Sequence, residues 1–318
     1  MNSKLKSNYF NLFALSEISV IEVSGDDSAS FFQRLLTSDI SEVSPNQSQF
    51  SAILNPKGRV IANFLLTMRN NRFYIVVAKE LVDSLVKRLR LYILRSKVNI
   101  DVEPSLGFFG CRQLPEINES ELPNSALETQ TIDEFTVVKM PGVDMRFGVL
   151  ADSSHTEVVD RPPDSDYWQL QDINAGIPWL NQHTSEHLIA QAINLDLIGG
   201  VSWTKGCYPG QEIVARLHYR GGINRRMVGA LSSAESKPVP GTDISCPDLP
   251  GNQTGTVVNS VVDTDYNQAS MLISIPIKFI GQENLLLSDT HPLELKIEHL
   301  PYSIPELEKA SSSGKQAE

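Results

Sequence analysis

Long apolar runs are missing from this sequence of 318 residues, and cysteine is scarce. No apolar run approaches the ~18 residues that a membrane-spanning helix needs. The start, MNSKLKSNYF, lacks the apolar core of a signal peptide. The three cysteines, Cys111, Cys207 and Cys246, are too few for a disulfide framework and too far apart for a CxxC metal site. We therefore expect a cytoplasmic protein with reduced thiols and no membrane attachment.

Positive charge is also in short supply, with 27 Lys and Arg against 38 Asp and Glu and a net charge of −11. This balance does not favour broad electrostatic binding to nucleic acid. The sequence contains no GxGxxG fingerprint, no phosphate-loop pattern and no GxSxG nucleophile elbow. Hydrophobic residues make up 41% of the chain, which is ordinary for a soluble globular protein of two or three domains.

The first third of the chain alternates strands with helices. We predict helices over 26–36 and 80–97, and strands over 19–24, 50–54, 60–67, 72–78 and 98–102. Asn-Pro and Lys-Gly turn signals join the second and third strands into a hairpin whose tip carries Lys57 and Arg59. This arrangement of strands and helices predicts an α+β, ferredoxin-like unit.

The rest of the chain changes character twice. Residues 113–135 form an acidic connection, strands are expected near 136–140 and 145–151, and 161–163 marks a turn before a helix over 167–175. Thr184 is expected to cap a short helix toward Ile193. After Arg226 the sequence is rich in Val, Ile, Thr, Pro and Gly without a helical period, which predicts a small β-barrel and then a disordered tail.

The stretch KGCYPGQE, residues 205–212, has the strongest chemical character. Pro209 and Gly210 suit a turn into a helix, which places Cys207 just outside a helix N-terminus. There the backbone N–H groups favour the thiolate, and Lys205 adds positive charge. A buried, inert cysteine is the alternative. Gln211 and Glu212 would shape the loop.

A basic segment and three tryptophans flank this loop. Arg216 and Arg225 could bind a carboxylate, a phosphate or a polyglutamate tail, or could pair with the surplus of acids. Trp168, Trp179 and Trp203 could form a flat slot for a pterin-like ring, although core packing is the simpler interpretation. The HTSEH stretch at 183–187 matches a zinc-peptidase pattern, but a cap at Thr184 would leave His183 outside the helix, so no metal site is predicted.

KGCYPGQEIVAR, followed by the RGG…RR segment, resembles the signature of the YgfZ family of folate-binding proteins, which are relatives of the glycine-cleavage aminomethyltransferase. VSGDD at 23–27, FQRLLTSD at 32–39, LNPKGR at 54–59 and AGIP at 175–178 resemble the family in type and order. The resemblance implies an aminomethyltransferase-like, ring-shaped arrangement of three domains with ferredoxin-like units and a C-terminal β-barrel. It also implies tetrahydrofolate, or a one-carbon derivative, in a central channel.

On this resemblance, residues 9–226 form the folate-binding region, with sub-parts 9–112 and 136–226, and residues 227–303 the barrel, before a tail at 304–318. Trp168 occupies the place of a folate-associated tryptophan, while Ile18 stands where a second aromatic is expected. We extend the candidate cofactor site to Tyr208, Gln211, Glu212, Arg216, Arg225, Lys57 and Arg59, and assign the functional chemistry to Cys207 and Lys205.

The resemblance implies an accessory protein for assembly or repair of iron–sulfur proteins, and through them for tRNA modification. Its partners would be folate and iron–sulfur proteins or their assembly machinery. Direct tRNA contact is not favoured, and a monomer is expected. Aminomethyltransferases carry adjacent aspartates where this chain has Ala62 and Asn63, which argues against a conventional enzyme. A folate-dependent one-carbon transferase and a folate-sensing module without chemistry remain the alternatives.

Overall fold

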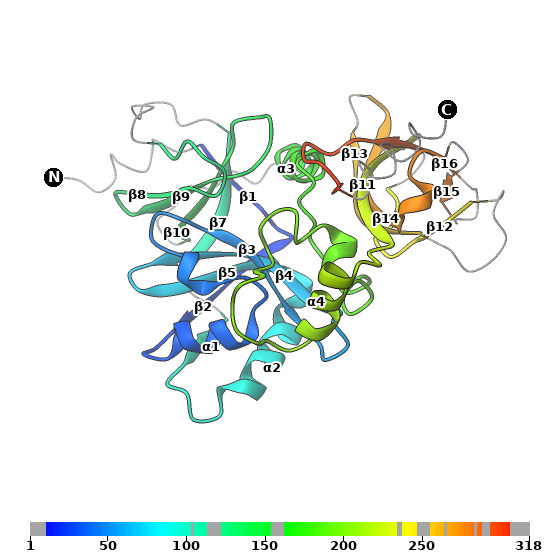
Figure 1. Cartoon of the computed structure of the whole chain (residues 1–318). Helices are drawn as coiled ribbons and strands as arrows, with labels where there is room; N and C mark the ends of the chain where they lie inside the picture. The colour runs from blue at the N-terminus through cyan, green and yellow to red at the C-terminus, as the bar shows by residue number, and fades with distance from the viewer. Residues whose placement is uncertain are drawn as a thin grey trace.

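Two open β-sheets and a closed barrel make up the computed structural model (Figure 1). The structure describes residues 11–102, 105–112, 122–153, 162–233, 237–246, 255–263, 266–282, 285–287 and 293–305. Within these residues no helix combines the length and the apolar character that crossing a membrane requires. This mixed architecture, with few helices and a terminal barrel, confirms the predicted fold class.

The first sheet is antiparallel, in the order β3 (Gln49–Leu54), β4 (Val60–Arg69), β5 (Arg72–Ala78), β2 (Ile18–Ser24) and β6 (Asn99–Asp101). Two helices, α1 (Ser28–Leu35) and α2 (Val82–Ile93), lie on its lower side in Figure 1. Phe32 of α1 meets Phe73 of β5 edge to face at 5.3 Å. The antiparallel pairing of β3 with β4 confirms the predicted hairpin. Helix α2 begins and ends inside its predicted range, because η4 (Lys79–Leu81) precedes it and Leu94, with a φ of 45°, follows it.

The second sheet follows the order β1 (Leu12–Ala14), β7 (Leu106–Cys111), β10 (Phe147–Asp152), β9 (Phe135–Lys139) and β8 (Thr129–Ile132). Residues 113–135 were predicted to be a connection without regular structure, but they contain strand β8, so that prediction is wrong for 129–132. Residues 113–121 of the same stretch lie outside the described residues. Helix α3 (Pro162–Asn174) starts at the predicted turn, because proline is well tolerated in a first helical turn. Residue 161 lies outside the described residues.

The barrel closes in the order β11 (Arg225–Ser233), β14 (Gln268–Pro276), β13 (Gly255–Asp263), β12 (Asp243–Ser245), β15 (Leu285–Leu287) and β16 (Leu293–Glu298). Its strands carry their own apolar core, and η7 (Ile277–Phe279) adds Phe279 to it. The barrel predicted from composition is thus confirmed. Ile304, assigned in advance to the tail, is buried in this core, and residues 306–318 lie outside the described residues.

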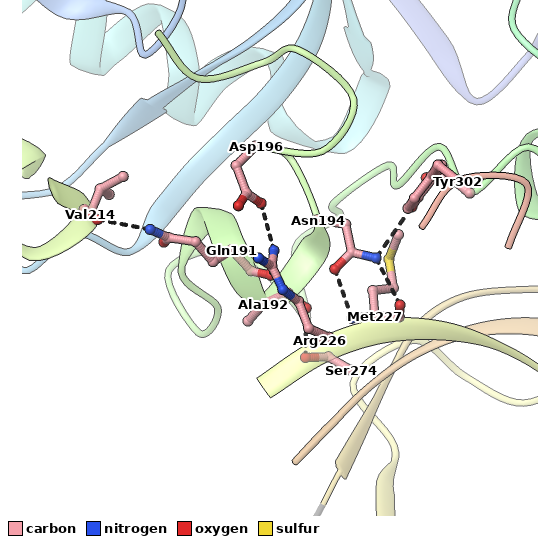
Figure 2. Close-up of polar contacts among 10 residues, drawn as sticks. Gln191, Ala192, Asn194, Asp196, Val214, Arg226, Met227, Ser274 and Tyr302 are labelled. Carbon is pink, nitrogen blue, oxygen red and sulfur yellow. Dashed lines mark hydrogen bonds and ion pairs between the residues drawn. The ribbon is translucent and has the colours of Figure 1, made fainter. Parts of the chain in front are cut away.

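Residues 190–196 form a polar junction between helix α4 (Gln211–Arg220) and the barrel (Figure 2). Gln191 donates to the Val214 carbonyl of α4 at 2.8 Å, while Asn194 exchanges two hydrogen bonds with the backbone of Met227 at 2.7 and 3.1 Å. The Arg226 guanidinium contacts Asp196 at 2.7 Å. The barrel is thereby fixed to the segment that carries the KGCYPGQE loop.

Short 3-10 turns replace one predicted helix. The chain forms η6 (Ala190–Ile193), and a similar turn, η3 (Ile40–Glu42), follows α1. The Thr184 hydroxyl accepts the Asn181 N–H at 3.0 Å within a turn, so the prediction that Thr184 caps a helix is wrong. The Asn181 side-chain oxygen instead stabilises this turn by accepting the backbone N–H groups of His183 and Thr184 at 2.9 and 3.2 Å.

Candidate ligand pocket and thiol loop

A pocket of about 240 Å³ lies where the first sheet, helix α3 and the barrel meet. Its wall combines apolar side chains with a few polar groups, as small-molecule sites do. The apolar and aromatic part is contributed by Leu15, Ile18, Ala78, Trp168, Ile173, Ile177, Trp179, Leu180 and Pro240. The polar part is contributed by Glu17, Glu80, Ser165, Gln169, Asp172, Asn181, Lys237, Asn259 and Ser260.

Two of the three tryptophans belong to this pocket. Trp168 is buried on α3 and meets Phe13 edge to face at 5.9 Å, while Trp179 is half-buried and follows the Ile-Pro break. Trp203 lies elsewhere, stacked on the His218 ring at 3.7 Å beside α4. The slot of three tryptophans is therefore corrected to two. Ile18 also lines the pocket, although no aromatic ring stands there.

Asp172 is the buried carboxylate of the pocket wall. Its Oδ1 contacts Arg146 at 2.6 Å, and its Oδ2 accepts the Trp179 indole N–H at 2.9 Å. Burial raises the pKa of Asp172, and the Arg146 charge opposes that rise. Both carboxylate oxygens thus already hold partners within the protein.

Asn63, at the place where aminomethyltransferases carry an acid, is a structural residue. Its amide donates to the Pro178 carbonyl at 2.7 Å and accepts the Leu180 N–H at 3.0 Å. Ala62 beside it is fully buried. These contacts tie β4 to the segment that forms the pocket wall and leave the Asn63 amide with no proton-transfer role.

The cysteine loop lies apart from the pocket. Helix α4 begins at Gln211 and Gly210 precedes it with a φ of 79°, as predicted, so Cys207 lies just before a helix N-terminus. Cys207 is exposed, which removes the alternative of a buried, inert thiol. The pocket wall contains neither Cys207 nor Lys205. The two residues to which the functional chemistry was assigned therefore lie outside the wall of this cavity.

The side chains of Lys205 and Tyr208 are buried in the protein. The Lys205 ammonium donates to the carbonyl oxygens of Leu36 and Ser38 at 2.8 and 2.7 Å. Its Nζ lies 5.5 Å from the centre of the buried Tyr208 ring, and burial raises the pKa of Tyr208 to about 12. Lys205 therefore anchors the loop to the end of α1, and Tyr208 is a core residue that does not line the pocket.

The burial of the Lys205 ammonium predicts that the stability of the protein depends on pH. Burial lowers the pKa of Lys205 from 10.5 to about 8, with Asp39 opposing the shift. The unfolded chain then binds more protons than the folded chain between these values, so the contribution of Lys205 is present above 10.5 and is lost as the pH falls through about 8. Urea unfolding should show wild type gaining stability over Lys205→Met as the pH rises from about 8 to 10.5. A difference independent of pH would contradict this.

The other proposed cofactor residues surround α4 and the hairpin tip. Gln211 is half-buried, and Glu212 and Arg216 are exposed on α4. Gly58 of the hairpin packs on Ile213 and Gly210, which brings Lys57 and Arg59 beside the start of α4. Arg59 donates to the His187 carbonyl at 2.6 Å.

Arg225, at the start of β11, lies close enough to Arg59 of the hairpin tip for the two positive charges to interact. Burial lowers the pKa of Arg225, and the nearby charge of Arg59 adds to that shift. None of the proposed cofactor residues of α4, the hairpin tip or the start of β11 belongs to the pocket wall. The structure thus brings Trp168 alone, of the predicted cofactor residues, to the pocket.

The exposure of the cysteines predicts a simple labelling result. Cys111 and Cys246 are buried and Cys207 is exposed. In the native protein a thiol reagent should modify Cys207 rapidly and the other two only after unfolding. Mass spectrometry of labelled peptides would show this, with Cys207→Ser as the control that labels slowly. Rapid native labelling of Cys246 would count against the described burial.

The HTSEH pattern has no metal-site geometry. Residues 181–187 form turns, so its histidines do not share a helix face. Among the residues that the structure describes, no group of three or more His, Cys, Asp or Glu side chains could hold a metal ion.

Sequence reasoning missed the partners of the pocket tryptophans. Arg146 and Asp172 lie 26 positions apart, and no motif signals their pairing. An acid four residues after Trp168 on a helix was the available hint, since such residues share a face.

Comparisons with known proteins agree with this architecture. Residues 6–104 match the family model described as the GCVT N-terminal domain. The tRNA-modifying protein YgfZ of Colwellia psychrerythraea is 30% identical over 243 residues, covering 73% of this chain and 75% of that protein. The protein of the same name from Yersinia pestis is 28% identical over 311 residues and covers 93% of both chains.

The fold has a solved counterpart. Aminomethyltransferase T of the glycine cleavage system from Bartonella henselae superimposes with a TM-score of 0.65, covering 94% of this chain and 88% of that chain. At 14% identity this likeness shows a shared fold. The curated relatives, the matched N-terminal domain and the fold agree on one assignment: the chain belongs to the YgfZ family.

Proposed function

We propose that this chain binds tetrahydrofolate, or a one-carbon derivative of it, in the pocket walled by Trp168 and Trp179. The observation that carries the proposal is a two-tryptophan pocket at the meeting point of three units in an aminomethyltransferase-like fold. A pteridine is flat and has polar edges, so apolar rings at its faces and polar groups at the rim suit it. The matched GCVT domain supports the same ligand class.

We further propose that the folate-loaded protein is an accessory factor for iron–sulfur proteins or their assembly machinery, and thereby supports tRNA modification. The names of the curated relatives support the link to tRNA modification. Cys207 is the functional thiol of this proposal. Because it is exposed and lies outside the pocket wall, its chemistry is directed at a partner on the surface, as thiol exchange or transient cluster contact.

The accessory role is favoured over one-carbon transfer. A transferase needs a base near the reacting folate. Here the amide of Asn63 is committed to Pro178 and Leu180, and Asp172 is committed to Arg146 and Trp179. The Asn63 amide cannot serve as such a base, and Asp172 could do so only by giving up its contact with Arg146 or Trp179.

The folate proposal is tested by titrating the protein with folinic acid, a stable reduced folate. Calorimetry should show saturable binding, weakened about two- to tenfold by Trp168→Phe because ring stacking adds roughly 0.5–1.5 kcal/mol. Trp203→Phe is the matched control, since Trp203 stacks on His218 outside the pocket. Absence of binding, or equal loss in both variants, would refute the site.

The thiol proposal is tested in cells that lack the native gene. Cys207→Ser should leave folinic acid binding intact and fail to restore iron–sulfur enzyme activity and the dependent tRNA modifications. Normal rescue together with normal folate binding would instead support a folate-sensing module without thiol chemistry. One-carbon transfer to an amine or thiol by the purified protein would support the transferase alternative.

A further inference from the structure

A buried ion pair connects the two tryptophans of the pocket. Arg146 and Asp172 are 2.6 Å apart, with side chains 0% and 6% exposed. Asp172 holds Trp179 through the indole N–H at 2.9 Å, and the Arg146 guanidinium carbon lies 4.5 Å from the centre of the Trp168 ring. One pair of charges therefore touches both aromatic walls, from two different elements.

The ion pair is costly to bury and incompletely satisfied. Arg146 Nη2 donates to the Pro141 carbonyl at 3.2 Å and to Asp172. Its Nε and Nη1 find no hydrogen-bond partner among the described residues. Apolar residues of similar volume often replace such pairs without loss of stability. Stability alone therefore does not account for charges at this place, whereas orientation of the tryptophans does.

These contacts join three segments of the chain. Arg146 directly precedes β10, Asp172 lies on α3, and Trp179 follows the break at Ile177 and Pro178. An indole side chain has two χ angles and therefore several staggered rotamers. A directional hydrogen bond to a fixed carboxylate selects one of them.

We propose that Asp172 and Arg146 are positioning residues that hold Trp179 and Trp168 in the orientation that binds a flat heteroaromatic ring. The inference rests on the proposed function, because the ring is that of a reduced folate. Neither residue is assigned a proton-transfer role: the carboxylate acts through the indole of Trp179, and the guanidinium acts through the face of Trp168.

The test compares two buried ion pairs. The first double variant, Arg146→Met with Asp172→Leu, removes both charges at the pocket. The second, Arg226→Met with Asp196→Leu, removes the buried pair of the polar junction, whose partners are 2.7 Å apart (Figure 2). Neither Arg226 nor Asp196 lines the pocket. Folinic acid affinity is measured by calorimetry and tryptophan orientation by near-ultraviolet circular dichroism. We expect the first double variant to bind about tenfold more weakly with an altered tryptophan spectrum. The second should bind as wild type does.

A smaller change keeps the test decisive if the first variant does not fold. Trp179→Phe removes the indole N–H and leaves both charges, and it should weaken folinic acid binding severalfold. Where both variants fold, combining them should weaken binding by less than the product of the two separate effects, because both remove the hydrogen bond between Asp172 and Trp179. Wild-type affinity and spectrum in the folded charge-free variant, or wild-type affinity in Trp179→Phe, would overturn the positioning role while leaving the folate proposal standing. Failure of the unaltered protein to bind would overturn both.

Discussion

Asp196→Ala should lower the free energy of unfolding by about 3–5 kcal/mol, the usual cost of leaving one member of a buried ion pair unpaired. Asp196 and Arg226 contact each other at 2.7 Å with side chains 6% and 2% exposed. The same guanidinium donates to the Gln191 carbonyl at 3.1 Å, so the stranded charge would sit inside the junction that joins the barrel to the loop-bearing segment. Urea titration followed by circular dichroism measures the loss.

The matched control is Asp26→Ala. Asp26 pairs with Lys97 at 3.3 Å, but both side chains are more than three-quarters exposed, at 80% and 76%. Solvent screens such a pair, so this variant should stay within about 0.5 kcal/mol of wild type. Adding Arg226→Met to Asp196→Ala should recover part of the lost stability. If it recovers nothing, the stranded charge is not the cause of the loss.

Gly210→Ala should cost more than about 2 kcal/mol and disturb the cysteine loop. Gly210 has a φ of 79°, and a Cβ atom there would come within 2.5 Å of the Asn55 carbonyl oxygen and 3.0 Å of the Gly58 Cα. Both obstacles are backbone atoms of the hairpin tip, so α4 and the hairpin must separate to make room. Thermal unfolding and the rate of Cys207 labelling both report the change.

Gly206→Ala is the control in the same loop. No atom lies within 4 Å of a Cβ built at Gly206, so this variant should unfold within about 1 kcal/mol of wild type. If the two alanine variants were equally stable, close packing of the hairpin against the helix start would be disproved.

The strands of the first sheet could be predicted because their signals are local. Strand β5 occupies the predicted 72–78, and the turn residues between β3 and β4 lie in the predicted hairpin tip. The barrel was also predictable, because strands need only β-forming residues and turn signals at short spacing. The start of α4 after Pro209 and Gly210 belongs to the same class.

The candidate site was less predictable because its contacts span the chain. Lys205 was expected beside the sulfur, yet it donates to Leu36 and Ser38, 169 and 167 positions away. The Lys205 ammonium binds backbone carbonyl groups that follow α1, and the sequence gives no sign that the fold brings these groups to it. Trp203 was grouped with the other tryptophans because it is near them in sequence, but its ring stacks on the His218 ring instead. Such choices depend on which surfaces the fold brings together.

The barrel has an uneven wall. Strands β11 and β14 pair along their whole length, from Arg225 with Pro276 to Ser233 with Gln268. Among the described residues, β12 makes two residue pairs with β15, Ile244 with Leu287 and Ser245 with Leu286, and two more with β13. We therefore expect local opening of the barrel to begin at β12, which has the fewest described residue pairs with its two neighbours. Deuterium should enter the amides of Ile244 and Leu286 long before it enters those of β14, so the short strands β12 and β15 set the rate at which the barrel wall first opens.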